Sequence, residues 1–435
     1  MPDRTAARLM QTTTRLKPLA ERVETCTAGA ARLLVLPTPV RSIVSFRGSF
    51  KTYPDFAAGT DLVQDLAVQL LDKGTRRRDR FAIAEVLENR GVELDFHTDG
   101  LWVRFSGRAL RDDLPEVIPI LTEQLREPLF DPGEFEKAKA HLAASLERSR
   151  ESTAAQASAA LARRLYPRAH PNYRPDPADD LARLAALTVD DVRAFHARHF
   201  GANDLTIVFV GDVDPGTVEA LVREGPGAWT PAAVRAPFAE RGRAASPGRT
   251  VVPMPDKENV DVRMGHPLPV RRQDPAFIPL YVANYILGGN FSARLMSTVR
   301  DEMGLTYGIY STLYGVTTEY EGHWQVDVTL SRENVERGVE ATLAEVRRFV
   351  EAGVTREELD EKKTTITGRF KVDLATTGGL AANLLRNAER GFDVGYLDRF
   401  PGEVEALTLA QVNEAVQAYF DPGRFHIALA GSLPD

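Results

Sequence analysis

The feature that most constrains this fold is an internal repeat. The segment from Leu187 to Pro215 aligns without a gap with the last segment of the chain, Leu407 to Asp435. Apolar residues and glycines recur at the same places in both segments: Leu187 with Leu407, Val192 with Val412, Phe200 with Phe420, and Gly211 with Gly431. Solenoid repeats have periods of about 20–50 residues, so a repeat this long indicates two copies of one domain. We therefore predict two homologous domains in tandem.

A compositional change between the halves predicts where the two domains meet. Residues 226–249 are rich in Pro, Ala, Gly and Arg and show no apolar periodicity, which is typical of a linker. We accordingly predict an N-terminal domain over residues 1–225, a linker over 226–249, and a C-terminal domain over 250–435.

Each half alternates helical and strand patterns. In the last segment, Thr408 and Gln411 form a capping-box pattern, and Val412 and Val416 continue at helical spacing before an alternating strand. Strands are also expected over residues 41–50 and 259–266, helices over 114–127 and 334–352, and a second capping box at Thr355 and Glu358. Long helices beside few strands favour an α+β class, with helices packed on one face of a mainly antiparallel sheet in each domain.

Composition excludes several classes of partner. The 435-residue chain carries a formal net charge of −7, whereas nucleic acids and acidic membranes require a dense basic surface. No apolar run approaches the roughly 20 residues of a membrane span, and the N-terminus lacks the apolar core of a secretory signal. The single cysteine, Cys26, cannot form an internal disulfide. We expect a cytoplasmic protein, or a periplasmic one if a signal peptide was removed.

The stretch from Gly288 to Tyr307 reads GGNFSARLMSTVRDEMGLTY. It resembles the C-terminal-domain signature of the insulinase/pitrilysin family of zinc metallopeptidases, in which a small-residue turn opens a helix that ends in Arg, and a Gly-Leu-x-Tyr strand follows. Taken with the repeat, the chain resembles the family's two-domain bacterial subunits. The resemblance implies tandem α+β domains, with an Arg and a Tyr that reach a zinc site carried on another domain.

The zinc motif of that family, H-x-x-E-H on a helix, is absent from this sequence. Counting back from the Lys73-Gly74-Thr75 turn places Asp65 at the first His, Val68 at the Glu, and Gln69 at the second His. Zinc binding needs two imidazoles on one helix face, and hydrolysis needs a carboxylate between them to deprotonate the bound water. Valine cannot act as a base and glutamine is a poor zinc ligand. We therefore predict no metal in this chain and a core role for the helix.

Other ligand candidates are weak. The family's third ligand falls at Ser145 or Leu146, with Glu147 nearby, and a metal site built from Asp65 and Glu147 is the least favoured alternative. His196 and His199 share a helix face, but no acidic residue lies between them, so we interpret them as a partly exposed helix surface.

Arg300 and Tyr307 are the candidate catalytic residues. They stand seven residues apart, the spacing that the family uses for a pair acting in the transition state. A guanidinium offers fixed donors to substrate carbonyls, and a phenol can donate a hydrogen bond to the developing oxyanion. Neither group generates a nucleophile, so both depend on a metal supplied from elsewhere.

The resemblance therefore implies a non-zinc subunit of a heterodimeric metalloendopeptidase, inactive alone. It would bind peptide substrate and donate Arg300 and Tyr307 to the zinc site of a homologous partner subunit that carries H-x-x-E-H. The alternative is a catalytically inert scaffold subunit of a larger complex.

Overall fold

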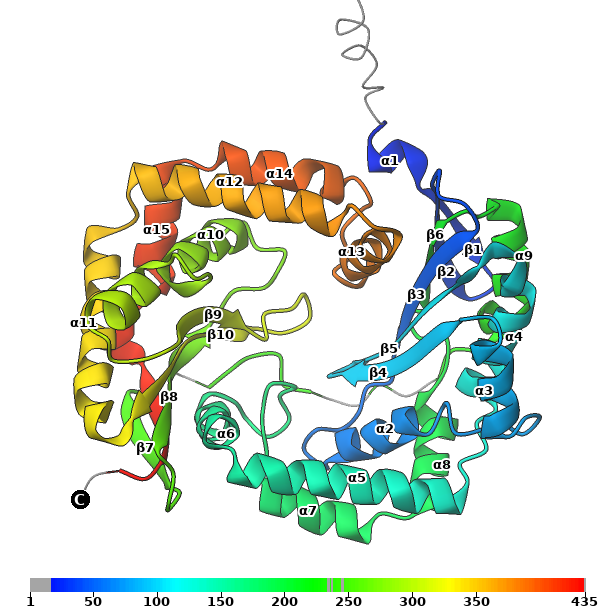
Figure 1. The fold of residues 1–435 in the computed structure, drawn as a ribbon, viewed down its shortest axis with the longest axis horizontal. Coiled ribbons are helices and arrows are strands. Elements are labelled where there is room, and N and C mark those ends of the chain that lie inside the picture. The colour runs from blue at the N-terminus through cyan, green and yellow to red at the C-terminus, as the bar shows by residue number, and fades with distance from the viewer. Residues whose placement is uncertain (1–16, 233–234, 236–237, 244–245, 434–435) are drawn as a thin grey trace, which may run out of the picture.

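The computed structural model describes residues 17–232, 235, 238–243 and 246–433. It consists of two lobes, each built on one β-sheet (Figure 1). The first half of the chain supplies one sheet and the second half supplies the other, as the repeat predicts. Helices connect the lobes on two opposite sides of the molecule, with α5 and α6 on one side and α12 and α13 on the other (Figure 1).

Both sheets are mixed, with one parallel strand pair among antiparallel ones. The first has the order β1-β2-β6-β3-β5-β4, where only β2 and β6 run parallel. The second has the order β7-β11-β8-β10-β9, where only β7 and β11 run parallel. The strands are β1 (Glu24–Ala28), β2 (Ala31–Pro37), β3 (Ile43–Lys51), β4 (Glu93–Asp99), β5 (Trp102–Leu110), β6 (Thr206–Gly211), β7 (Gly248–Pro253), β8 (Asn259–Leu268), β9 (Ile309–Tyr314), β10 (Gly322–Ser331) and β11 (His426–Gly431). The predicted α+β class is confirmed.

The helices divide between the two halves of the chain. Those of the first half are α1 (Leu19–Arg22), α2 (Thr60–Gln69), α3 (Arg80–Glu88), α4 (Leu114–Arg126), α5 (Pro132–Glu151), α6 (Thr153–Leu165), α7 (Pro177–Ala186), α8 (Val189–His199) and α9 (Pro215–Glu224). Those of the second half are α10 (Phe277–Gly288), α11 (Val335–Ala352), α12 (Arg356–Asp373), α13 (Thr377–Glu389), α14 (Tyr396–Ala406) and α15 (Leu409–Tyr419). No helix of the described residues is long and apolar enough to cross a bilayer.

The repeat is reproduced in local detail. Helix α8 and strand β6 of the first half correspond, at the predicted register, to α15 and β11 of the second. Both helices begin with a complete capping box, at Thr188 and at Thr408. The matched glycines Gly211 and Gly431 both have positive φ, 145° and 148°, which few side chains tolerate.

A lysine contact that the alignment did not include is also duplicated. The ammonium group of Lys139 on α5 donates to the carbonyl oxygens of Ala185 and Leu187, where α7 ends. Lys363 on α12 does the same for the end of α14. A cation at a helix C-terminus satisfies carbonyls that have no partner within the helix. The two halves therefore share this helix-ending contact as well as their topology.

The two halves exchange one helix each. Helix α6 of the first half packs on β8 and β11 of the second sheet, and α13 of the second half packs on β3 and β6 of the first (Figure 1). Alanines of α6 meet Ala428 and Ala430 on β11, and leucines of α13 meet Val208 and Val210 on β6. The expectation of helices on one face of each sheet is thus incomplete, because a helix from the other half covers the second face.

The predicted linker contains little regular structure. Residues 226–228 form a short 3₁₀ turn, and β7 begins at residue 248. Among the described residues between them, none belongs to a helix or strand. The domain boundaries at residues 225 and 250 stay a prediction.

Candidate active site

Helix α2 carries the three positions that the sequence resemblance aligns with the family's metal motif, Asp65, Val68 and Gln69. It begins after Gly59, whose φ of 78° is in the left-handed region, and it ends before the Lys73-Gly74-Thr75 turn. Val68 is buried in the core of the first half, and Gln69 is half-buried. An apolar side chain and an amide at these positions supply neither a base nor a good zinc ligand.

Asp65 lies on the same helix but is not prepared to hold a metal. Burial first, and then the nearby carboxylate of Asp61, raise the pKa of Asp65 to about 7. Burial likewise raises the pKa of Asp180, on α7, to about 6. A metal ligand must lose its proton, whereas these carboxyl groups retain theirs more readily than exposed ones do.

The third-ligand positions give no support to a metal centre. Glu147 is exposed on α5 and pairs with Arg150 at 2.9 Å, while Leu146 packs against the apolar core of the first half. Across the described residues, no group of three or more His, Cys, Asp or Glu side chains could hold a metal ion. The residues present therefore do not fit the family's zinc.

The two neighbouring histidines are structural. The prediction of a partly exposed helix surface is wrong for His199, which is buried and has its Nδ1 atom 2.8 Å from the carbonyl oxygen of Thr52. His196 lies 2.9 Å from the carbonyl oxygen of Leu125 and packs edge-on against Phe130. Burial lowers the pKa of His196 to about 4, so it stays neutral and joins two packed elements.

Arg300 and Tyr307 flank the end of η4 (Met296–Glu302), a π-helical segment that follows the Gly288-Gly289 turn. The Arg300 guanidinium contacts the carboxylate of Asp301 at 2.6 Å and lies 4.6 Å from the centre of the Phe291 ring. Tyr307 is 97% exposed and precedes β9, which begins only at Ile309. Neither the guanidinium of Arg300 nor the phenol of Tyr307 is therefore part of the hydrophobic core of the second half.

The surroundings of this pair are unusually apolar for a surface. Phe291 is 64% exposed, and Met303 and Tyr310 also present much of their side chains to solvent. Helix segment η4 packs on α11 and β9, whereas α2 packs on α8, β4 and α5. The Arg/Tyr segment and the degenerate metal helix therefore belong to different lobes, each with its own supporting elements.

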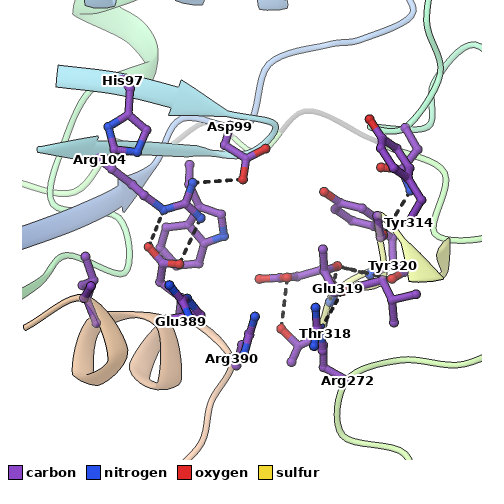
Figure 2. A pocket seen from close by; sticks show the side chains of 18 of the residues that line it. His97, Asp99, Arg104, Arg272, Tyr314, Thr318, Glu319, Tyr320, Glu389 and Arg390 are labelled. Carbon is purple, nitrogen blue, oxygen red and sulfur yellow. Dashed lines mark hydrogen bonds and ion pairs between the residues drawn. The ribbon is translucent and has the colours of Figure 1, made fainter. Parts of the chain in front are cut away.

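A cavity between the lobes was not predicted from the sequence. The tips of the β4-β5 and β9-β10 hairpins and helix α13 line this cavity (Figure 2). Its volume is about 530 Å³. Arg104 on β5 joins the two halves of the chain at the cavity wall, because its guanidinium donates two hydrogen bonds, of 2.8 and 2.9 Å, to Glu389 at the end of α13. Arg104 and Glu389 are separated by 285 positions in the sequence. No spacing pattern in the sequence therefore indicates that they meet.

Comparison with known proteins relates both halves of the chain to one family. The family model described as Insulinase (Peptidase family M16) matches residues 66–174, and that described as Peptidase M16 inactive domain matches residues 186–366. The non-peptidase homolog YmxG of Helicobacter pylori is 23% identical over 81% of each chain. A Streptomyces coelicolor protein described as an uncharacterized zinc protease is 26% identical over 72% of this chain and 68% of its own.

Solved structures show the same architecture. The peptidase M16 inactive domain from Pseudomonas fluorescens superimposes with a TM-score of 0.85, covering 95% of this chain and 98% of the other at 23% identity. A protease from Helicobacter pylori gives a TM-score of 0.82 at 15% identity, covering 96% of this chain and 100% of its own. With both halves matched by family models and the whole fold shared, the chain belongs to the M16 (insulinase) peptidase family, as a member in which the H-x-x-E-H zinc motif is missing.

Proposed function

We propose that this chain is the zinc-free subunit of a heterodimeric metalloendopeptidase. It binds peptide substrate and contributes Arg300 and Tyr307 to the zinc site of a homologous partner subunit. The observation that carries the proposal is a contrast within one chain. The metal positions are occupied by Asp65, Val68 and Gln69, while Tyr307 stands fully exposed beside an exposed Phe291.

The chemistry of the pair suits a shared site. Peptide hydrolysis at zinc places negative charge on the carbonyl oxygen, and a phenol or guanidinium that approaches this oxygen stabilises the transition state. Arg300 is only 30% exposed and is held by Asp301 and the Phe291 ring, so its orientation is restrained. Tyr307 makes no side-chain hydrogen bond to any described residue, which leaves its hydroxyl available to a substrate or a partner.

A second candidate function is an inert scaffold. It is favoured by the name of the Helicobacter pylori relative, a non-peptidase homolog. It is also compatible with the Arg300–Asp301 ion pair, since a guanidinium already paired to a carboxylate is less available to substrate. In that case the exposed apolar residues around η4 would serve assembly alone.

Complementation with a partner distinguishes these functions. The partner is a homologous chain from the same genome that carries H-x-x-E-H. A library of quenched fluorogenic peptides is offered to each chain alone and to their mixture, with and without a chelator. Activity only in the mixture, abolished by the chelator, supports the proposed subunit. If the mixture cleaves no peptide although light scattering shows that the two chains associate, the scaffold function is supported.

Variants then test the pair itself. Tyr307→Phe removes one donor to the oxyanion, and we expect turnover of the complex to fall about a hundredfold with assembly unchanged. Tyr310→Phe is the matched control, because Tyr310 is a nearby exposed tyrosine outside the proposed pair. Full activity in the double variant Arg300→Ala with Tyr307→Phe would overturn the catalytic role.

A further inference from the structure

The cavity between the hairpins collects positive charge in an acidic protein. Its lining includes six arginines and three carboxylates, a formal excess of three positive charges, whereas the whole chain carries −7. The neighbouring His97 adds no charge at neutral pH, because burial lowers its pKa below the ordinary value of 6.5. The arginines are Arg47, Arg104, Arg174, Arg272, Arg386 and Arg390, and the carboxylates are Asp99, Glu319 and Glu389.

Each carboxylate of the cavity already has a cationic partner. Glu389 receives both hydrogen bonds of the Arg104 fork, and Asp99 pairs with the same guanidinium at 3.1 Å (Figure 2). Glu319 pairs with Lys51 at 3.1 Å. No carboxylate of the lining is left to neutralise the other arginines.

Five of the six arginines accordingly lack a carboxylate partner among the described residues: Arg47, Arg174, Arg272, Arg386 and Arg390. Arg174 donates only to the hydroxyl oxygen of Tyr314, at 3.4 Å. The Arg272 Nε atom donates to the carbonyl oxygen of Val316 at 3.0 Å, and Arg386 donates to the side-chain oxygen of Asn383 at 3.3 Å. Both acceptors are neutral, so the positive charges of these guanidinium groups are not compensated. Burial, followed by the charges of Arg272 and Arg386, lowers the pKa of Arg390 to about 9.

This convergence is not explained by helix ends alone. Arg386 and Arg390 stand at the C-terminal end of α13, where the helix dipole favours cations. Arg47 lies on β3 of the first half and Arg272 follows β8 of the second, so neither benefits from that dipole. Like charges brought together from separate elements repel, and groups perturbed in this way cluster at functional sites.

We propose that this cavity binds the carboxylates of an acidic peptide, which makes Asp- and Glu-rich segments the preferred substrates of this subunit. Guanidinium groups hold carboxylates through paired hydrogen bonds, and the walls add the aromatic rings of Trp102, Tyr314 and Tyr320, against which a peptide backbone can pack. A volume of about 530 Å³ is within the usual range of ligand sites. The inference rests on the peptide-binding part of the function proposed above.

The test measures binding to the full chain without a partner subunit, so that it does not depend on turnover. Three probes are used: a short fluorescein-labelled, amidated peptide that alternates Glu with Ala, the same peptide with Gln for every Glu, and inorganic pyrophosphate as competitor. The wild type is compared with Arg386→Gln combined with Arg390→Gln. The matched control combines Arg198→Gln with Arg337→Gln, two exposed arginines on helices α8 and α11.

We expect the wild type and the control to bind the Glu peptide at least about tenfold more tightly than the Gln peptide, and the cavity variant to lose that preference. The cavity variant should melt no lower than the wild type, since it loses mutually repelling charges. Equal binding of the two peptides, or a preference retained by the variant, would overturn the inference while leaving peptide binding in place.

Two further outcomes separate the remaining explanations. Binding of neither peptide would overturn both the inference and the peptide-binding part of the proposed function. If the Glu preference is present and pyrophosphate does not displace the labelled peptide, the peptide assignment stands. Tight pyrophosphate binding without any Glu preference would overturn the peptide assignment in favour of a site for small anions.

Discussion

Replacing Asp65 with Asn tests whether the former ligand position now holds a half-buried acid with a raised pKa. Burial and the Asp61 carboxylate raise the pKa of Asp65 from an ordinary 3.8 to about 7. The folded chain therefore binds this proton more tightly than the unfolded chain. The resulting penalty is absent below about pH 4, grows as the pH rises, and is complete above about pH 7.

The size of the effect follows from the shift. About three pKa units correspond to at most about 4 kcal/mol at pH 8. The pKa of Asp61, one turn earlier, is also raised by burial, so the two carboxyls share the excess proton affinity. We expect Asp65→Asn to raise the free energy of unfolding by roughly 2 kcal/mol at pH 8 and by less than about 1 kcal/mol at pH 5.

Urea unfolding at both pH values, followed by tryptophan fluorescence, measures the difference in midpoint. Asp360→Asn is the control, because Asp360 is exposed on α12 and makes no ion pair with any described residue, and it should show no difference between the two pH values. An Asp65→Asn protein less stable than the wild type at pH 8 would refute the reasoning. It would mean that the ionised carboxylate stabilises the fold, as a metal ligand would.

Other predictions follow from the same structure. Leu161→Ala, on the exchanged helix α6, should lower stability by about 2–5 kcal/mol, and an unchanged melting temperature would contradict the exchange. Gly211→Ala should be severely destabilising, because the new Cβ would lie 2.1 Å from the carbonyl oxygen of Ile43. Gly368→Ala, in open space inside α12, should gain about 0.5–1 kcal/mol by the same denaturation assay. After dialysis against zinc, metal analysis of the purified chain should find less than stoichiometric metal, and one equivalent would restore a metal site at Asp65.

The sequence predicts the fold in some detail because the signals are local or repeated. The register between α8-β6 and α15-β11, the capping boxes at Thr355 and Thr408, and the α+β class all follow from spacing and side-chain type. The exchange of α6 and α13 does not, since an amphipathic helix does not encode which sheet it covers. The cavity was missed for a related reason, because its arginines share no spacing and meet only through that exchange.

The candidate site was predictable only in part. Asp65, Val68 and Gln69 were placed on a helix by counting from the Lys73-Gly74-Thr75 turn, and the structure puts all three on α2. The full exposure of Tyr307 could not be read from the sequence, where the resemblance to the family implied a Gly-Leu-x-Tyr strand, whereas β9 begins only at Ile309. The roles of Arg300 and Tyr307 in a shared site remain predictions for the complementation assay.

The exchanged helices also set the order of events at the ribosome. Residue 389, the last of α13, is 178 positions after residue 211, where the last strand of the first sheet ends. Since translation proceeds at about 5–20 residues per second, α13 is synthesised roughly 10 to 35 s after the last strand of the first sheet. Until then the apolar residues that α13 covers face solvent: Leu34, Leu36, Val208 and Val210. During synthesis this half is a long-lived apolar surface, and a nascent chain halted before α13 would present it indefinitely to chaperones.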